Sequence, residues 1–444
     1  MTSENIAAIS TALAPSGVAV IRISGDNPLI VAEKMFTPLG KTPVKEFTPN
    51  VMYAGEVDAG DFCDFGMCVY FKAPKSFTGE DTIEFHIHGG TAITRGVLQK
   101  VLSSGARLAT NGEFTKRAFI NGKLSLSSAE GLIDMINSEA VSGVRAGYNL
   151  YREKLTKEIE LEQDKITQAL AEIDADMDFP EEDLEEMSTD RVQELLSSVV
   201  EKLDKLIASY KTGRILKSGV KVAIVGKPNT GKSSTLNAIL NYDKAIVSDI
   251  AGTTRDIVEG ATDINGVRFN FSDTAGIRES DDVIERMGVN LSKRVLEESD
   301  IILFIIDASQ FDSLDEEIFE LIKDKNYITV INKIDKSDIK DDRADVYISA
   351  INSTNIESLK TLLYQRAVGT VDTNGEYLVE ERHYEALKRA REKIGFSLQS
   401  LGVVPLELVS IDLKDGWDAL GEISGKTASE EIINTIFAKF CVGK

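Results

Sequence analysis

The sequence has 444 residues, 42% of them hydrophobic and 27% charged, with a formal net charge of −22. This length predicts about two to four domains, and the acidic balance argues against unassisted binding to nucleic acid, leaving a local basic patch or a partner to supply the positive surface. With no apolar run near the ~18 residues of a membrane span, no secretory signal and too few cysteines for a disulfide framework, we expect a soluble, cytoplasmic protein with no membrane association.

The pattern of residues 1–118 predicts a compact α+β domain. The apolar, β-branched run Val18–Ser24 and the alternating run Thr82–His88 each end at a glycine and predict strands. Thr91–Ser103 carries apolar residues on one side and predicts a helix after the second of these strands.

Residues 119–218 and 369–444 are predicted to be helical. Apolar stripes at helical spacing run through 151–173 and 192–206, and similar stripes return near the end of the chain. Ten acidic residues and no basic ones fall in 171–190, which we interpret as a solvated helix end and turn rather than an ion or partner site. Neither helical segment offers a complete core alone, so we predict one helical domain built from both.

The residues between these helical segments alternate strands and helices. The runs Val220–Val225, Ile301–Ile306 and Tyr327–Ile331 are strongly apolar, as expected of parallel strands covered by helices on both faces. We predict a domain inserted into the helical one, which compact domains allow because their chain ends often lie close together. The predicted fold class is α/β and multidomain: an N-terminal α+β domain (1–118), a discontinuous helical domain (119–218 and 369–444) and an inserted α/β domain (219–368).

The segment Gly226–Ser233 fits the spacing G-x-x-x-x-G-K-S. It stands directly after a predicted strand and before a predicted helix, the context that identifies a phosphate-binding loop. Glycines let backbone N–H groups wrap phosphates, and the following helix directs its positive end at them. We expect Lys232 to neutralise the β- and γ-phosphates and Ser233 to supply an oxygen to Mg²⁺.

Three downstream segments predict that the nucleotide is GTP. Asp273–Gly276 follows a predicted strand, so its carboxylate can hold Mg²⁺ through water and its last N–H can reach the γ-phosphate. In the segment Asn332-Lys333-Ile334-Asp335, the last carboxylate can accept the ring N–H and the exocyclic amine of guanine, which adenine does not offer. The segment Ser349-Ala350-Ile351 can give a backbone N–H to the guanine oxygen.

Hydrolysis needs a group that the sequence lacks at the usual place. Ile277 stands where many small GTPases have a glutamine that orients the attacking water. Three candidates remain: Thr254, in a first-switch segment, to cap Mg²⁺; Asn229, in the phosphate loop, to coordinate a monovalent cation; and Glu285, to position water. Composition alone favours a surface position for Glu285.

These residues resemble the cation-dependent TRAFAC-class GTPases. The flanking segments resemble the MnmE (TrmE) family of tRNA modification GTPases, and the resemblance covers essentially the whole chain. The matching segments are Phe77–Asp81, His88–Gly90, Gly112–Phe114, Arg117–Phe119, Asp178–Glu182 and the chain end Phe440–Lys444.

The resemblance implies an N-terminal folate-binding domain, a discontinuous helical domain and an inserted Ras-like P-loop G domain. The N-terminal domains are expected to form a constitutive homodimer, and the G domains to meet in the GTP state. K⁺ held by Asn229, Ser248, Ile250 and Thr253 would do electrostatically what an arginine finger does elsewhere, and Glu285 matches the family's water-positioning carboxylate. The GTP-binding set implied by the family also includes Thr230, Gly231, Lys232, Ser233, Ser234, Asp249, Ala251, Gly252, Thr254, Asp273, Thr274, Ala275, Gly276, Asn332, Lys333, Asp335, Ser349, Ala350 and Ile351.

The resemblance also implies a substrate and partners. In a heterotetramer with the FAD-dependent partner MnmG, the protein is expected to add an aminomethyl or carboxymethylaminomethyl group to carbon 5 of the tRNA wobble uridine. The one-carbon unit would come from a 5-formyl- or 5,10-methylene-tetrahydrofolate derivative. Arg22, Glu84, Lys123 and Lys444 match the family's folate-binding positions, and basic groups suit a glutamate tail.

Some alternatives stay open at this stage. Cys441 is either a reactive thiol near the folate or a semi-buried cysteine at a helix end. His86 and His88 are better explained as a structural pair on a strand than as a metal site. A ribosome-assembly GTPase would share the switch motifs but carry a basic RNA-binding tail, and a folate-binding scaffold would not need complete nucleotide motifs.

Overall fold

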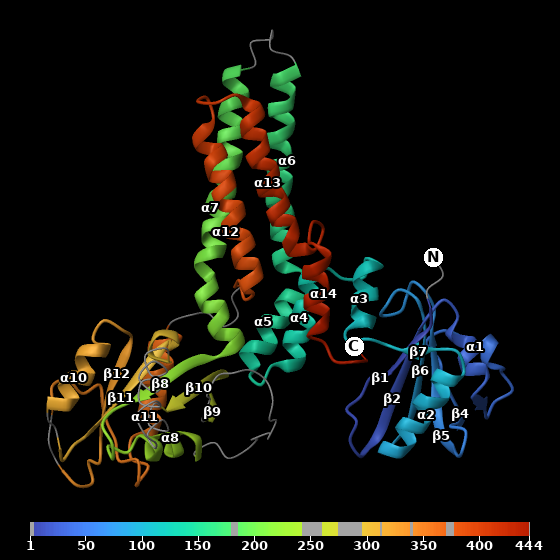
Figure 1. The fold of residues 1–444 in the computed structure, drawn as a ribbon, viewed down its shortest axis with the longest axis horizontal. Helices are drawn as coiled ribbons and strands as arrows, with labels where there is room; N and C mark the ends of the chain where they lie inside the picture. Colours follow the sequence, from blue (N-terminus) through green and yellow to red (C-terminus); the bar gives the residue numbers. More distant parts are fainter. Residues whose placement is uncertain are drawn as a thin grey trace, which may run out of the picture. The chain divides into compact units, whose positions relative to one another are not determined.

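The computed structural model describes residues 4–178, 185–241, 260–273, 295–310, 313–337, 341–369 and 377–443. The chain divides into two compact units, whose elements are labelled in Figure 1. The first comprises Met1–Ile133, Leu150–Gln193 and Glu392–Lys444, and the second Asp134–Asn149 and Glu194–Arg391. Among the described residues, no helix is long and apolar enough to cross a membrane.

The first unit contains a seven-stranded sheet in the order β3-β4-β5-β6-β2-β1-β7. Inward-facing residues of β2 and β6 are buried under α1 and α2, whereas the alternate residues Arg22 and Glu84 face the other side and pair in register. The two strands and the helix predicted from the sequence are confirmed. The elements are β1 (Ile6–Ile9), β2 (Ser16–Gly25), α1 (Pro28–Glu33), β3 (Phe36–Pro38), β4 (Met52–Asp58), β5 (Cys63–Phe71), β6 (Asp81–Gly89), α2 (Thr91–Ser103), β7 (Arg107–Leu108) and α3 (Glu113–Ile120).

Long helices follow, and α6 packs beside α13 although the two lie far apart in the sequence. The apolar stripe through 151–173 lies on two helices rather than one, because Glu153 has a left-handed φ of 61° between α5 and α6. The helices are α4 (Leu126–Asn137), α5 (Val141–Tyr151), α6 (Lys154–Asp178), α7 (Glu185–Ser218), α12 (Glu381–Ser400), α13 (Leu406–Ser424) and α14 (Glu430–Ala438).

The second unit contains a six-stranded sheet in the order β13-β12-β11-β8-β10-β9, parallel except for β9. Helices α8 and α11 pack on one face and α10 on the other, so both faces are buried, and the central strands β8, β11 and β12 are largely apolar. The predicted inserted α/β fold is confirmed. The elements are β8 (Val220–Val225), α8 (Lys232–Asn241), β9 (Gly260–Ile264), β10 (Val267–Asp273), β11 (Ile301–Asp307), α10 (Ser313–Ile322), β12 (Tyr327–Asn332), β13 (Val346–Tyr347) and α11 (Ile356–Ala367).

Candidate functional site

The phosphate-binding loop joins β8 to α8, at the carboxyl ends of the parallel strands. Its chain turns through left-handed conformations at Asn229 (φ 65°) and Gly231 (φ 96°). A Cβ at Gly231 would lie 2.2 Å from Nδ2 of Asn332, and one at Gly226 would lie 2.3 Å from the carbonyl oxygen of Ile305. Both glycines are therefore required by close approach, and the loop is shaped as a cradle of backbone groups.

Lys232 lies inside this cradle. The residue is 7% exposed, and its Nζ donates to the carbonyl oxygens of Gly226 at 2.9 Å and Lys227 at 2.8 Å. A cation held at the start of a helix favours an anion, because the helix dipole and the free N–H groups of the first turn act in the same direction. The chemistry of these donors fits the phosphates of a nucleotide, and Ser233 stands in the first turn of α8, where its hydroxyl suits Mg²⁺.

The Asn-Lys-x-Asp segment follows β12 and meets the loop. Asn332 Nδ2 donates to the carbonyl oxygen of Thr230 at 2.9 Å, and Lys333 Nζ donates to that of Asn229 at 2.6 Å. Lys333 also pairs with Asp307 at 2.6 Å. Burial raises the pKa of Asp307, but hydrogen bonds from Lys333 and Ser309 outweigh this effect and lower that pKa. The carboxylate therefore stays charged.

The segment after β13 completes the arrangement. The backbone N–H of Ala350 donates to Oδ1 of Asn332 at 3.1 Å, and Ser349 Oγ donates to Oδ1 of Asp335 at 2.5 Å. Ile351 is 71% exposed. Three segments that are separate in sequence thus share one network at one edge of the sheet, where a base and its phosphates can be held together.

Sequence reasoning missed Asp307. This carboxylate is 7% exposed and ends β11, a strand whose other residues are all apolar. Its signal was present in the sequence, since a charged residue directly after a buried parallel strand reaches the edge where ligands bind.

Several predicted residues lie outside the described part of the chain. Asp273 is the last residue of β10, and nothing is described of its side chain. The remaining ones are Ser248, Asp249, Ile250, Ala251, Gly252, Thr253, Thr254, Thr274, Ala275, Gly276, Glu285 and Lys444.

The predicted folate residues Arg22 and Glu84 lie on the first unit. Arg22 Nε is 2.7 Å from Oε1 of Glu84, and its guanidinium lies over the rings of Phe77 at 5.5 Å and Phe114 at 5.7 Å. Burial raises the pKa of Glu84, but hydrogen bonds from His86 and Arg22 outweigh it and lower that pKa. The result is a charged, half-buried pair flanked by aromatic rings, a setting in which a flat heterocycle with N–H groups can bind.

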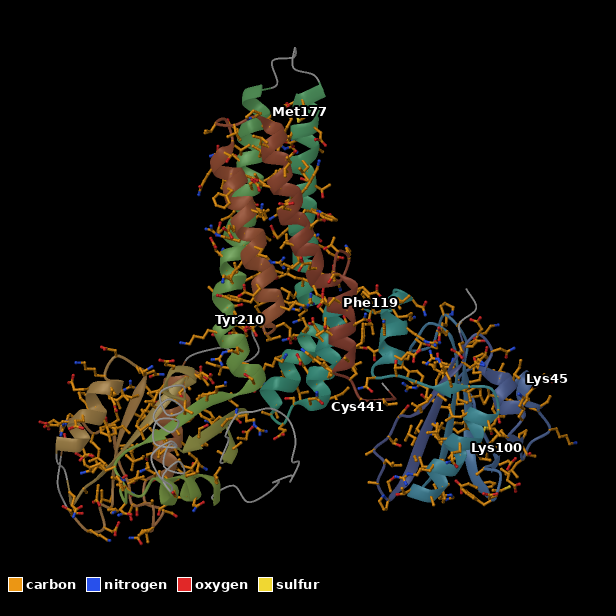
Figure 2. The ribbon with its side chains drawn as sticks, in the orientation of Figure 1. Lys45, Lys100, Phe119, Met177, Tyr210 and Cys441 are labelled. Atoms are coloured by element: carbon orange, nitrogen blue, oxygen red, sulfur yellow. The ribbon has the colours of Figure 1, made fainter. Side chains whose placement is uncertain are left out.

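The end of the chain lies against this domain. Val442 forms a β-bridge with Asn111, and the carbonyl oxygen of Gly443 accepts a 3.3 Å hydrogen bond from Ser10. Cys441, just beyond α14 in Figure 2, is exposed. Lys123 Nζ donates to the carbonyl oxygen of Pro74 at 2.9 Å. The helical domain therefore contributes its last residues to the region of the N-terminal sheet.

The His86 and His88 pair has carboxylate partners rather than a shared ligand. His86 lies 3.4 Å from Glu84, and His88 lies 2.7 Å from Asp64. Across the described residues there is no group of three or more side chains able to hold a metal ion.

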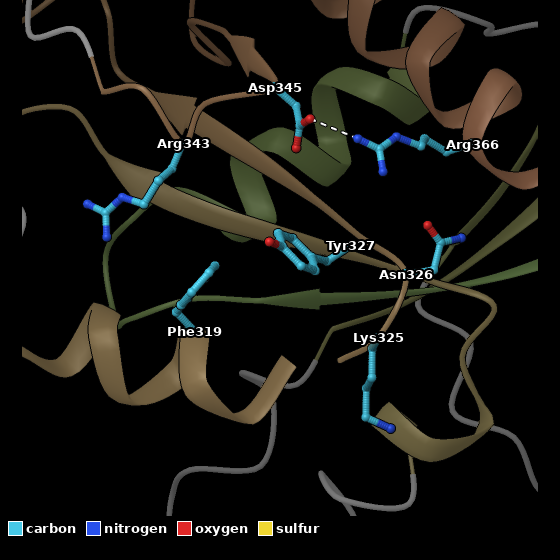
Figure 3. Close-up of a pocket in the computed structure, with 7 residues that line it drawn as sticks. All are labelled: Phe319, Lys325, Asn326, Tyr327, Arg343, Asp345 and Arg366. Atoms are coloured by element: carbon cyan, nitrogen blue, oxygen red, sulfur yellow. Dashed lines mark hydrogen bonds and ion pairs between the residues drawn. The ribbon is translucent and has the colours of Figure 1, made fainter. Parts of the chain in front are cut away.

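A pocket of about 280 Å³ lies on the second unit where β12 begins, at the opposite edge from the phosphate loop (Figure 3). Arg366 pairs with Asp345 at 3.0 Å, and Arg343 pairs with Asp341 at 2.7 Å. Lys325 donates to a backbone carbonyl at 3.2 Å. Because each cation already has an acceptor, we assign this pocket no ligand.

The fold and the loop define a P-loop protein of the guanine-nucleotide-binding class. A family model described as the MnmE helical domain matches residues 126–441, and one described as the GTP-binding protein TrmE N-terminus matches residues 5–123. The chain therefore belongs to the MnmE family of tRNA modification GTPases, and it is a GTP hydrolase.

Curated relatives match the chain along its full length. The tRNA modification GTPase MnmE of Thermoanaerobacter pseudethanolicus is 39% identical over 460 aligned residues, which cover 100% of each chain. That of Acetivibrio thermocellus is 39% identical and that of Clostridioides difficile 38% identical, each over 99% of both chains.

Proposed function

We propose that this protein uses GTP hydrolysis to drive the modification of carbon 5 of the tRNA wobble uridine. The product carries an aminomethyl or carboxymethylaminomethyl group, and the reaction is carried out in a heterotetramer with the FAD-dependent protein MnmG. The observation that carries the proposal is the presence, on one chain of this family, of a hydrogen-bonded network between the phosphate loop and the predicted guanine segments, and of the Arg22–Glu84 pair beside aromatic rings. A cytoplasmic location fits this role.

GTP and Mg²⁺ are assigned to the loop between β8 and α8. Lys232 neutralises the phosphates, Ser233 and Thr254 hold Mg²⁺, and Asp335 selects guanine. Mg²⁺ would stabilise the charge that develops on the transferred phosphoryl group. The cradle in which Lys232 already lies on loop carbonyls supports this assignment.

K⁺ is assigned to Asn229, Ser248, Ile250 and Thr253. The left-handed backbone of Asn229 is held by the hydrogen bond from Lys333 to its carbonyl oxygen, which supports a role for this position of the loop. Glu285 is assigned the positioning of the attacking water, because Ile277 cannot perform it.

Hydrolysis is predicted to be much faster in K⁺ than in Na⁺, because the ligand set selects ion size. Glu285→Ala is expected to keep its GTP affinity and lose most of its turnover. Phosphate release measured in the two salts, with nucleotide affinity measured separately, tests both. Equal hydrolysis rates in K⁺ and Na⁺ would contradict the K⁺ assignment. Full turnover in Glu285→Ala would show that Glu285 does not position the attacking water.

A tetrahydrofolate derivative, either 5-formyl- or 5,10-methylene-, is assigned to Arg22, Glu84, Lys123 and Lys444. The donor set suits it, because a carboxylate accepts from a pterin N–H edge and lysines attract a glutamate tail. Val442 and Gly443 lie against the same domain, which supports a contribution from the neighbouring Lys444.

A homodimer is proposed through the N-terminal domains. The sheet face that carries Glu84 also exposes Phe65 (56%), Met67 (44%) and Met52 (50%) on β4 and β5. Clustered exposed apolar side chains mark interaction surfaces. Light scattering should return twice the mass of the single chain, and a single-chain mass would contradict the dimer.

A further inference from the structure

The second residue of the phosphate loop, Lys227, turns its side chain into the protein. Its Nζ lies 2.6 Å from Oδ2 of Asp315 on α10 and donates to the carbonyl oxygen of Gln310 at 2.9 Å. Lys227 is 8% exposed and Asp315 is fully buried. A buried ion pair is retained only where its hydrogen bonds are good, since both charges are costly to remove from water.

The backbone of the same residue organises the loop. The carbonyl oxygen of Lys227 accepts from Lys232 Nζ at 2.8 Å and from Thr230 Oγ1 at 3.0 Å. The ion pair thus attaches Lys227 to α10. The carbonyl oxygen of this same residue accepts hydrogen bonds from the phosphate-binding Lys232 and from a hydroxyl of the loop.

Two other bonds hold the loop from outside, from Asn332 to the carbonyl of Thr230 and from Lys333 to that of Asn229. Both come from the segment that follows β12, on the guanine side. The ion pair between Lys227 and Asp315 instead attaches the loop to α10, a helix that covers one face of the sheet. Without it, the first half of the loop would lose its side-chain attachment to the domain.

We propose that Lys227 is a positioning residue for the phosphate site, which it orients through its buried pair with Asp315 on α10. The pair holds the Lys227 carbonyl at the place from which Lys232 reaches the phosphates. The proposal concerns nucleotide binding only, and it stands whether or not the assigned K⁺, folate and tRNA roles are correct.

The test compares variants of the full-length chain by the affinity for a fluorescent GDP analogue and by thermal unfolding without nucleotide. Lys227→Met is expected to bind the analogue about tenfold more weakly, since charge-assisted bonds are the strong ones. Lys227→Arg is expected to restore most of the affinity, because a guanidinium can also bond a carboxylate. Lys323→Met is the matched control, since Lys323 is exposed just beyond α10, pairs with Glu320 at 2.5 Å and should have no effect on affinity.

The double variant Lys227→Met, Asp315→Leu separates positioning from support of the fold. It removes both buried charges, so thermal stability should recover relative to Lys227→Met. If the pair positions the loop, the affinity for the GDP analogue should stay about tenfold weaker than in the wild type. Apolar contact between Met and Leu is not directional, so it would not hold the carbonyl of residue 227 in place as the hydrogen-bonded pair does. Affinity that recovers together with stability, or an unchanged affinity in Lys227→Met, would overturn the proposal.

Discussion

Among single residues, the guanine pocket that we propose depends on how the Asp335 carboxylate is held. Its Oδ1 accepts the hydroxyl of Ser349 at 2.5 Å, which ties the end of β12 to the segment after β13. The backbone N–H of Ala350 also donates to Oδ1 of Asn332 at 3.1 Å, which joins the same two segments. A carboxylate fixed by neighbours keeps its direction, and direction is what selects a base edge.

Asp335→Asn is predicted to weaken GTP binding by at least about 100-fold, because each of two bonds to a charged acceptor contributes ~1.5–3 kcal/mol. Xanthine nucleotides should gain relative to guanine, since an amide can donate to the carbonyl that replaces the guanine amine. Competition against a fluorescent GDP analogue measures both. Asp341→Asn is the control, as its carboxylate pairs with Arg343 away from the loop; unchanged GTP affinity in Asp335→Asn would refute the assignment.

The nucleotide site could be predicted because its segments are short and contiguous. The segments Gly226–Ser233 and Asn332–Asp335 can each be identified from the spacing of a few neighbouring residues. The Arg22 contacts with Phe77 and Phe114, and the pairing of Lys227 with Asp315, join residues far apart in the chain. No spacing records such contacts, so only the fold reveals them.

Among the elements, the last turns of α7 pack against residues 377–384, which lead into α12. Tyr210 stacks on Tyr384 with ring centroids 4.3 Å apart, and a Cβ at Gly213 would lie 2.0 Å from the carbonyl oxygen of Leu378. Lys217 then pairs with Asp134 at 2.9 Å and also with Glu380. Lys217 on α7 therefore connects Asp134 on α4 with Glu380, the residue that precedes α12.

This junction predicts a pH dependence of stability. Burial, followed by the charge of Glu380, raises the pKa of Asp134 above its usual value of 3.8. Between the usual and the raised pKa, the folded chain binds a proton that the unfolded chain does not. The free energy of unfolding therefore falls as the pH rises through that interval.

Asp134→Asn is predicted to remove this slope, because the amide stays neutral at every pH. Between pH 5 and 8 the wild type should lose roughly 1 kcal/mol or more of stability that the variant keeps. Unfolding by urea at several pH values measures the difference. Asp204→Asn, which removes an exposed partner of Arg391, provides the control; identical slopes in Asp134→Asn and the wild type would show that Asp134 ionises normally.

At the scale of the whole molecule, one chain carries the means to hydrolyse GTP and a second polar site on another domain. The hydrolase is shown by its family and by its fold. The chain end lies against the N-terminal domain through the bridge between Asn111 and Val442, although the helices before it belong to the segment that flanks the inserted domain. The residues proposed for folate lie mainly on the N-terminal sheet of the first unit, and those proposed for GTP lie at the edge of the sheet in the second unit.

We propose above all that GTP turnover by this protein drives the modification of the wobble uridine. Mass analysis of wobble nucleosides in cells that lack the protein tests it, after complementation with the wild type or with Asp335→Asn at equal protein levels. We expect the aminomethyl-type groups at carbon 5 to be lost in the deletion, restored by the wild type and not restored by Asp335→Asn. Unchanged wobble uridines in the deletion strain would contradict it.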